Sequence, residues 1–557
     1  MTEKLRETLD KLSSRTAIKY AVYVLAIIIF FFLILLPPIL GIFIKWDNIQ
    51  YILNQPPLVN RALSAIQNSF IIALIVAALD LLAGIPMAWL ISRGKSRWLN
   101  AIDTLADIPF IIPTTALGYS LLLFWSGSGG VSALFGGSLI APGWLLVMLL
   151  HFTFSFPVVV RTLVGALLDY KMEFERASRT LGAPPFTAMR TVTFPVLRPA
   201  MISAFILAFA RSISETGATI VVAGAFENGP VFIQNMKNAF NAGTVTQATY
   251  SGAIVFASFI LIAVSIGIFI AIRLIGPKLR LPLRRVRPLT ERKLSYKKAE
   301  RSRNTVILVV FFAIILLPSL FVALSAFQAI PTPTITNALT GSGIWGGYWQ
   351  SLLVSYGLGA IVTVINIIIG LPTAIIIARK KAGKFMSSIF DLLVNIPLVV
   401  PSIALGVSLA IFWNTSFSLP ELLVLIFAHM AITYPYFVRS MSAAVERISP
   451  DMEEAARTLG AKPLGVFRTL VFPLTKYSML SGAIMVFTRS VSETGATVAV
   501  IAANSPLQTA PVLLVNWIKI PGLASSLDIA LGSGFLVLFS FMILLALRLV
   551  VGRKEKY

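Results

Sequence analysis

The sequence predicts an all-α, polytopic membrane protein with about twelve transmembrane helices, arranged as two parallel six-helix repeats. The prediction depends on a composition with 57% hydrophobic and only 12% charged residues, on a series of long apolar runs, and on a repeat that relates the two halves of the 557-residue chain. Soluble globular domains carry about 25% charged residues, so this composition indicates a lipid environment.

Each apolar run is long enough to cross a bilayer, which takes about 20 residues in a helix. In the first half the runs cover approximately residues 20–44, 66–92, 104–126, 141–169, 197–224 and 251–275. In the second half they cover approximately 305–328, 352–379, 388–413, 420–446, 477–503 and 528–551. We therefore expect a first half at 1–275, a basic linker at 276–303 and a second half at 304–557.

Lysine and arginine gather before the first run, after the second, fourth and eighth runs, in the linker, and at the C-terminus. With an even number of spans all these clusters fall on one side, which the enrichment of basic residues in cytoplasmic loops identifies as the cytoplasm. We expect a multi-pass protein of the cell (plasma) membrane with both termini cytoplasmic. The formal net charge of +23 then indicates anionic lipid, not nucleic acid, as its partner. The absence of cysteine excludes disulfides and thiolate metal sites.

The two halves match without a gap from the fourth apolar run of each half to the fifth. His151 aligns with His429 and Arg211 with Arg489, at a constant offset of 278 residues. Because each half has an even number of spans, both halves have the same orientation in the membrane, which is a parallel repeat. One chain therefore supplies two equivalent bundles.

One repeated motif occupies the loop after the fourth run of each half, at residues 174–183 and 452–461, which we call the docking segments. Small residues in a short helix allow another protein to approach closely, and a following glycine allows the chain to turn. The candidate docking residues are Glu175, Arg176, Ala177, Ser178, Gly182, Glu453, Glu454, Ala455, Ala456 and Gly460.

The second docking segment, with Glu454-Ala455-Ala456, then Gly460 and a later Phe472-Pro473 pair, resembles the signature of permease subunits of binding-protein-dependent ABC importers. In that family the loop is the coupling helix that receives the motion of a cytoplasmic ATPase. The resemblance implies partners in two copies of that ATPase, which hold ATP and Mg, and in an external solute-binding protein. It implies a transport permease without cofactor or enzymatic activity of its own.

The first docking segment departs from the signature. Arg176 stands where the family has Glu, and Glu175 lies one place earlier. The resemblance therefore implies two docks of unequal charge.

A second repeated motif lies inside the apolar run after each docking segment, from Arg211 to Thr219 and from Arg489 to Thr497. An Arg and a Glu four residues apart share one helix face. Ionisable groups in membrane spans usually face the bundle interior or a water-filled path. Two roles remain open: an ion pair that packs the halves together, and the wall of a translocation path. The candidate path residues are Arg211, Ser214, Glu215, Gly217, Thr219, Arg489, Ser492, Glu493, Gly495 and Thr497.

The substrate class follows from two resemblances that disagree. The sequence around Glu215 and Glu493 is similar to permeases for sulfate, molybdate and tungstate, whereas the fusion of two halves resembles the ferric-iron and thiamine permeases. We expect a small inorganic ion such as an oxyanion, with ferric iron or thiamine as the alternative. An ion-coupled secondary transporter is a second class, in which Glu215 and Glu493 would be the mid-membrane carboxylates; the paired arginines and the docking segments argue against it. A channel or scaffold is a third class, for which no selectivity motif is present.

His151 and His429, the only two histidines, begin equivalent spans. They are interpreted either as structural residues with satisfied hydrogen bonds or as contacts for substrate near an outer mouth. The structural interpretation is favoured.

Overall fold

The computed structural model describes residues 13–94, 96–127, 129–278, 288–502 and 505–552, and these residues form helices and connecting turns without a strand. Ten helices in this part of the chain are long and apolar enough to cross a membrane, and two bent helix pairs raise the number to twelve when each pair is taken as one span. The prediction of an all-α membrane protein with about twelve spans is confirmed.

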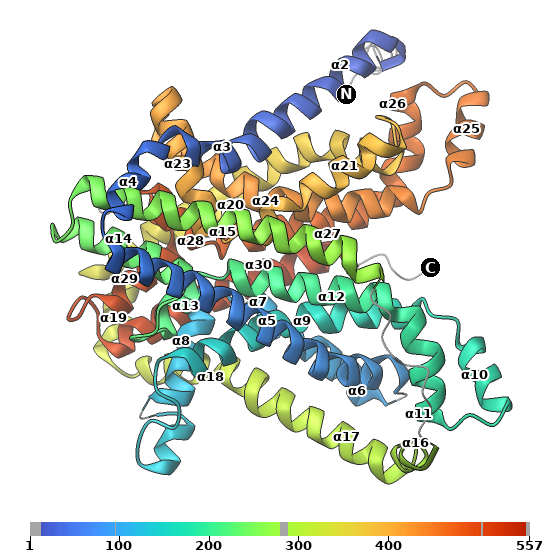
Figure 1. Ribbon diagram of the computed structural model, residues 1–557, viewed down its shortest axis with the longest axis horizontal. Helices are drawn as coiled ribbons and strands as arrows, with labels where there is room; N and C mark the ends of the chain where they lie inside the picture. The colour runs from blue at the N-terminus through green and yellow to red at the C-terminus, as the bar shows by residue number, and fades with distance from the viewer. Residues whose placement is uncertain (1–12, 95, 128, 279–287, 503–504, 553–557) are drawn as a thin grey trace.

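The first half alternates long spans with short connecting helices, as Figure 1 shows from blue to green. In chain order its helices are α2 (Thr16–Ile29), α3 (Leu36–Ile44), α4 (Ile49–Leu53), α5 (Pro56–Arg93), α6 (Arg97–Leu105), α7 (Ile108–Ile111), α8 (Thr114–Ser126), α9 (Trp144–Leu168), α10 (Met172–Thr180), α11 (Pro185–Ala188), α12 (Phe194–Ser214), α13 (Gly217–Val222), α14 (Gly229–Asn241) and α15 (Gln247–Ile275).

The second half repeats this order. Its helices are α16 (Pro288–Leu294), α17 (Lys297–Val310), α18 (Leu317–Ala329), α19 (Pro333–Thr340), α20 (Ile344–Ala378), α21 (Lys384–Val394), α22 (Ile396–Val399), α23 (Ser402–Phe417), α24 (Glu421–Glu446), α25 (Pro450–Thr458), α26 (Pro463–Val466), α27 (Phe472–Val491), α28 (Gly495–Val500), α29 (Ala510–Lys519) and α30 (Ser526–Gly552).

The third apolar run of each half is broken where the sequence predicted a continuous span. The helices before and after the break, α6–α7 with α8 and α21–α22 with α23, meet at an angle of 105°. Pro113 and Pro401 stand at the breaks, and the residues before them, Ile112 and Val400, have extended ψ angles of 127° and 137°. A proline disfavours the helical conformation of the residue before it, which explains both bends.

The first span of each half packs against the opposite half. The backbone of Gly41 on α3 touches α23 so closely that a Cβ atom would stand 1.9 Å from the Ser408 carbonyl oxygen. On the other side, Ser120 Oγ on α8 donates to the Pro318 carbonyl on α18 at 2.6 Å. The sequence boundary between residues 275 and 304 therefore does not separate two packing units, because each bundle contains one span of the other half.

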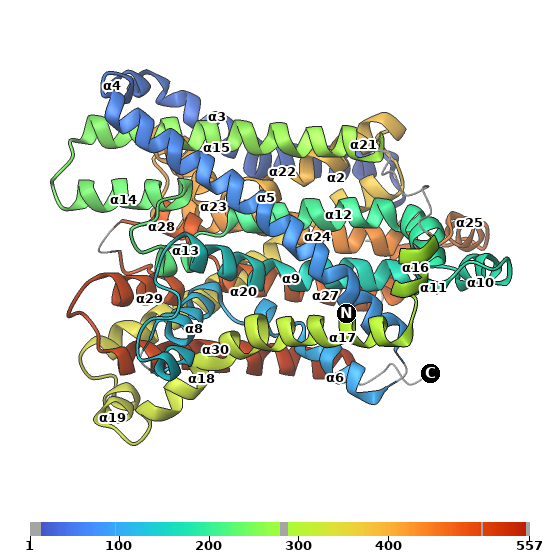
Figure 2. The same cartoon turned by 60° about the horizontal axis from the view of Figure 1, so that its bottom comes forward.

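Both docking segments lie at one end of the molecule, where α10 and α25 project from the body, while α14, α19 and α29 lie at the opposite end (Figures 1 and 2). The N-terminal part joins this docking end through Ser13 Oγ, which accepts from Leu464 N at 3.3 Å. The linker joins it through Glu291, which is 2.6 Å from Arg190.

The predicted linker at 276–303 is only partly a separate segment. Within its described residues, α16 is a short helix and α17 begins at Lys297, so the seventh span starts inside the region predicted as linker. Residues 279–287, which hold several of its arginines, lie outside the described residues.

Candidate functional site

Two interrupted spans, α12–α13 and α27–α28, meet at the interface between the halves. A Cβ atom on Gly217 would stand 2.4 Å from Thr494 Oγ1, and one on Gly495 would stand 2.7 Å from Thr216 Oγ1. Glycine is therefore required at both positions, because each break touches the other. We call residues 214–217 and 492–495 the paired breaks.

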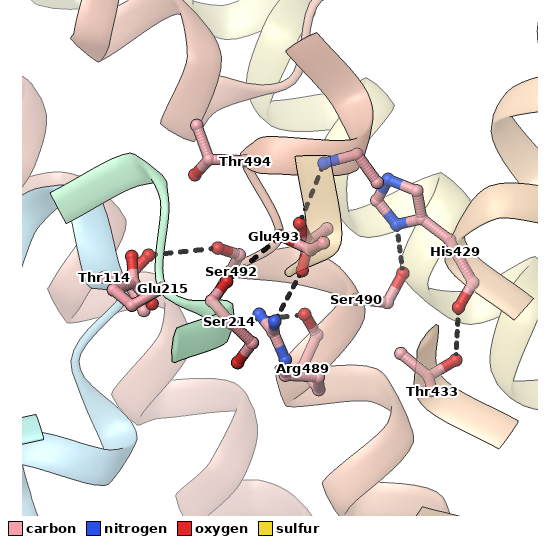
Figure 3. A network of polar contacts seen from close by, with 12 residues as sticks. Thr114, Ser214, Glu215, His429, Thr433, Arg489, Ser490, Ser492, Glu493 and Thr494 are labelled. Carbon is pink, nitrogen blue, oxygen red and sulfur yellow. Dashed lines mark hydrogen bonds and ion pairs between the residues drawn. The ribbon is translucent and has the colours of Figure 1, made fainter. Parts of the chain in front are cut away.

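Hydrogen bonds from the opposite half close the paired breaks. Thr114 Oγ1 donates to the Ser492 carbonyl and Ser402 Oγ donates to the Ser214 carbonyl, both at 3.3 Å. Figure 3 shows the side chains that converge here, with Glu493 at the centre. The carboxylates of the motif are almost out of reach of solvent, with Glu215 3% and Glu493 1% exposed. In this conformation the interface is closed at the level of the paired breaks.

The sequence analysis placed each glutamate on the same continuous helix as its arginine. In the structure both glutamates lie in the breaks instead. Helix α12 ends at Ser214 and α27 at Val491, one or two residues before each glutamate. Each carboxylate accepts a hydrogen bond from the first turn of the following helix, Glu215 from Ala218 N and Glu493 from Ala496 N, both at 3.0 Å. A side-chain oxygen thus satisfies a backbone N–H group that the break leaves without a helical partner.

The two predicted ion pairs differ. Arg489 Nη2 lies 2.7 Å from Glu493 Oε2, so the second-half pair forms. Arg211 instead stacks on Phe154, 3.8 Å from the ring centroid, and donates from Nε to the Phe154 carbonyl at 3.2 Å. No ion pair joins Arg211 to Glu215 among the described residues, so the prediction of two equal pairs is wrong.

The cause of this difference is the aromatic surroundings of Arg211. The rings of Phe110 and Phe154 both lie beneath its guanidinium group, which cation–π attraction stabilises in a desolvated place. The repeat places Leu398 and Ile432 at the corresponding positions of the second half. Without a ring to stack on, Arg489 turns to the carboxylate.

Both histidines bridge the helices on either side of a break. His151 Nδ1 and Nε2 lie 2.8 Å from the hydroxyls of Ser212 on α12 and Thr219 on α13. His429 makes the same contacts, with Ser490 at 2.9 Å (Figure 3) and with Thr497 at 2.8 Å. Because the two rings are 2% and 0% exposed, they hold the breaks in shape and do not face an outer mouth. Thr219 and Thr497, predicted to line a path, are occupied by these bonds.

Sequence reasoning missed a buried acid beside Ser155, one helical turn after His151. Asp80 on α5 is wholly buried, and its Oδ2 accepts a hydrogen bond from Ser155 Oγ, while Oδ1 has no partner in the part of the chain that the structure describes. The second half has Asn366 in the same place, which donates to Thr433 Oγ1 at 2.8 Å. An acid inside the apolar run 66–92 was the available signal.

We expect Asp80→Asn to raise the free energy of unfolding by about 1–3 kcal/mol, because a neutral amide costs less to bury than a carboxyl with a free oxygen. The mirror change Asn366→Asp is expected to lower it by a similar amount. Thermal melting of both variants in one detergent measures the difference. Loss of stability in Asp80→Asn would show that the carboxyl has a role that the amide cannot fill.

A second overlooked residue ties the halves together at the end opposite the docking segments. Lys237 on α14 donates to the Ile501 carbonyl at 2.7 Å and to the Val498 carbonyl, at the end of α28. Burial lowers the pKa of Lys237 from 10.5 to about 8. This contact crosses from the first half to the second and closes the interface above the paired breaks.

A cavity of about 470 Å³ opens on the other side of the paired breaks. Its lining runs along α12 from Pro195 and Arg198, near the docking end, to Ala210, one helical turn before Ser214. The second half contributes residues of α21, α22 and α24. We call this space the inner cavity; it extends from the docking end along α12 to within one helical turn of the first break.

The docking segments divide into residues that face the spans and residues that face outward. Glu175 is buried and 3.4 Å from Arg93, and Glu453 is 2.6 Å from Arg379, so each carboxylate ties its segment to the end of a span. The exposed docking residues are Arg176, Ala177, Gly182, Glu454, Ala455 and Gly460, while Ser178 and Ala456 are half-buried. The two glycines have φ angles of 92° and 90°, which few other residues adopt.

Comparison with known proteins identifies the same family in both halves. Residues 80–281 and residues 370–553 each match the family described as binding-protein-dependent transport system inner membrane component. Together the two matches cover well over half of the chain. Each includes the docking segment and the break of its half.

Sulfate transport proteins are among the similar relatives. A probable sulfate transport system permease protein of Nephroselmis olivacea is 34% identical over 217 residues, which are 38% of this chain and 73% of the relative. The sulfate transport system permease protein of Salmonella typhimurium is 31% identical over 206 residues, 35% of this chain and 72% of the relative. The corresponding Escherichia coli protein is 30% identical over 210 residues, with the same shares.

Proposed function

Because the chain belongs to the inner membrane components of binding-protein-dependent transport systems, we propose that it forms both transmembrane bundles of an ATP-driven importer for a sulfate-type oxyanion. The observation that carries this proposal is the inner cavity, which lies between the halves and extends from the docking end toward the first of the paired breaks. The sulfate relatives support an oxyanion over ferric iron or thiamine.

The geometry supports a mechanism in which two cytoplasmic ATPase subunits, holding ATP and Mg, bind α10 and α25 and move them together. Glu175 and Glu453 pass that movement to α5 and α20 through Arg93 and Arg379. The adjoining α12 and α27 then separate the paired breaks, and the site opens toward an external solute-binding protein. ATP binding acts by shifting the population toward this second conformation.

The two candidate roles of the central charges are both represented in this mechanism. Arg489 with Glu493 holds the closed break, and both residues join Arg211, Ser214, Glu215 and Ser492 in the polar wall when the breaks separate. We infer that the substrate passes between Gly217 and Gly495, where the halves now touch, and reaches the inner cavity.

The direct test reconstitutes the chain with its ATPase and binding protein in vesicles and measures ATP-dependent uptake of radioactive sulfate. Molybdate and thiosulfate serve as competing oxyanions, and ferric iron and thiamine as the alternatives. We expect competition by oxyanions alone. Uptake without ATP, driven by a proton or sodium gradient, would instead identify a secondary transporter.

We propose that the docking end faces the cytoplasm, which places the described linker residues and both termini there. Lys298 is exposed on α17 at this end, and Leu339 is exposed on α19 at the other. In this cysteine-free chain, an impermeant thiol reagent applied to intact cells is expected to label Leu339→Cys and to spare Lys298→Cys. If only Lys298→Cys were labelled, the docking end would face the outside of the cell and the proposed orientation would be wrong.

The unequal charges of the two docks lead to a further expectation. Arg176 and Glu454 are exposed at the same position of α10 and α25. We expect Glu454→Arg to weaken ATPase association more than Arg176→Glu, by about 0–1 kcal/mol as for other exposed charges. A pull-down titration at low salt measures both affinities; equal losses would show that the two docks bind in the same way.

A further inference from the structure

Three charged residues meet across the halves at the docking end of the inner cavity. Asp391 on α21 lies 2.7 Å from Arg439 on α24 and 2.9 Å from Arg273 at the end of α15. Arg439 is 53% exposed and Arg273 39% exposed, so both guanidinium groups reach water. One carboxylate therefore serves two arginines, and the cluster keeps an excess positive charge.

The repeat supplies a matched cluster in the first half with the opposite balance. Arg161, the counterpart of Arg439, makes four hydrogen bonds, two of them to the Asp107 carboxylate at 2.7 Å and two to Asp103 at 2.6 Å. The Arg439 side chain makes one hydrogen bond among the described residues, to Asp391. Four of the five N–H groups of the Arg161 guanidinium are thus used, whereas Arg439 retains more donors for another partner.

A single difference in sequence accounts for this asymmetry. Asn395 stands in the second half at the position of Asp107, and its amide donates to the backbone carbonyl of Asp391. The fold of this region tolerates two carboxylates, as the first half shows. Packing therefore does not explain why the second half lacks this carboxylate. Its absence leaves Arg439 with several N–H donors that have no partner among the described residues.

Other groups around the same space add to its positive charge. Arg198 lines the inner cavity with Arg273 and Arg439. A neighbouring hollow of about 430 Å³ shares Arg273, Asp391 and Arg439 and adds Lys380 and Glu446. Over both spaces, four basic side chains stand against two acidic ones.

We propose that the inner cavity contains an anion site, formed by Arg439, Arg273 and Arg198, which receives a tetrahedral oxyanion after it has passed the paired breaks. Planar guanidinium groups donate paired hydrogen bonds to such anions and are the usual residues for this purpose. Only the identity of the anion as sulfate rests on the proposed function. Because the arginines are partly exposed, binding is weakened by salt and the anion is released readily to water.

The test uses equilibrium binding of radioactive sulfate to the purified full chain in neutral detergent, without ATPase or binding protein. Asn395→Asp restores the carboxylate that the first half carries and is expected to weaken binding about tenfold, as a loss of about 1.4 kcal/mol does. The mirror change Asp107→Asn, which alters the first-half cluster and leaves the inner cavity unchanged, is the matched control and is expected to bind as the wild type does. Arg198→Gln, just inside α12, is expected to weaken binding without changing a residue of either cluster.

Two further measurements distinguish a free anion from a lipid headgroup as the ligand of this site. Phosphate and molybdate are added as competitors, and the measurement is repeated in nanodiscs of neutral lipid and of phosphatidylglycerol. Competition by free anions with unchanged binding in phosphatidylglycerol supports the proposal. Displacement of sulfate by phosphatidylglycerol alone would assign the cluster to lipid headgroups and overturn it.

The outcomes separate this inference from the proposed function. Absence of wild-type binding, or equal binding by Asn395→Asp, overturns the anion site even where ATP-driven sulfate uptake is normal. Sulfate binding that is strong in the wild type and weak in Asn395→Asp supports the site even where sulfate is not the transported solute. In that case sulfate takes the place of another anion of the same charge.

Discussion

Glu493→Gln is expected to lower the free energy of unfolding by about 3–5 kcal/mol, the usual cost of leaving one partner of a buried ion pair alone. Glu493 is 1% exposed and its Oε2 lies 2.7 Å from Arg489 Nη2. The same change at Glu215 is expected to cost less, because Arg211 stacks on Phe154 and does not depend on that carboxylate. Thermal melting of the two single variants in the same detergent measures the difference.

A double variant separates stability from transport. Arg489→Gln combined with Glu493→Gln removes both charges and is expected to recover most of the stability, since the cost came from an uncompensated charge. We expect transport to stay low in the double variant, because the polar wall of the separated breaks has lost two charged groups. Recovery of both stability and transport would show that the pair has only a packing role.

Gly217→Ala is expected to reduce ATP-driven uptake at least about tenfold, because the closed breaks lose at least about 1.4 kcal/mol relative to the open state. The added Cβ would stand 2.4 Å from Thr494 Oγ1 and 2.6 Å from Thr494 Cβ. Threonine is branched at Cβ and cannot swing away, so the two halves must move apart. Uptake and ATP hydrolysis are measured together in vesicles; we expect hydrolysis to continue without uptake.

The control for this prediction is Gly267→Ala on α15, where an added Cβ meets no atom within 4 Å. It changes the same residue type inside a span and is expected to leave uptake unchanged. Gly495→Ala, which would place its Cβ 2.5 Å from Ser402 Oγ, is expected to match Gly217→Ala. Normal uptake by both break variants would mean that the halves need not touch during transport.

The fold was predictable because the features that determine it can be seen directly in the sequence. Long apolar runs define the spans, and the constant offset between His151 and His429 defines the repeat. The two bends were also within reach, since Pro113 and Pro401 mark them. They were predicted as continuous spans because proline inside a membrane helix is often tolerated.

The central site was only partly predictable, because its details depend on contacts between distant segments. The separation of Arg211 from Glu215 follows from rings on two other spans, at Phe110 and Phe154. The spacing of four residues was identical in both halves and gave no sign of the difference. The contact of Gly217 with Thr494 likewise exists only after the halves have assembled.

Because the first span of each half packs against the opposite half, the first span of the chain is synthesised long before the helix that it contacts. Ile42 on α3 donates from its backbone to Ser408 Oγ on α23, a partner made 366 residues later. At about 5–20 residues per second, that span waits tens of seconds in the bilayer before its neighbour is translated. On separate polypeptides the delay would last until two molecules met by diffusion. Joining the halves in one chain bounds the delay by the speed of the ribosome and fixes the two bundles in equal number.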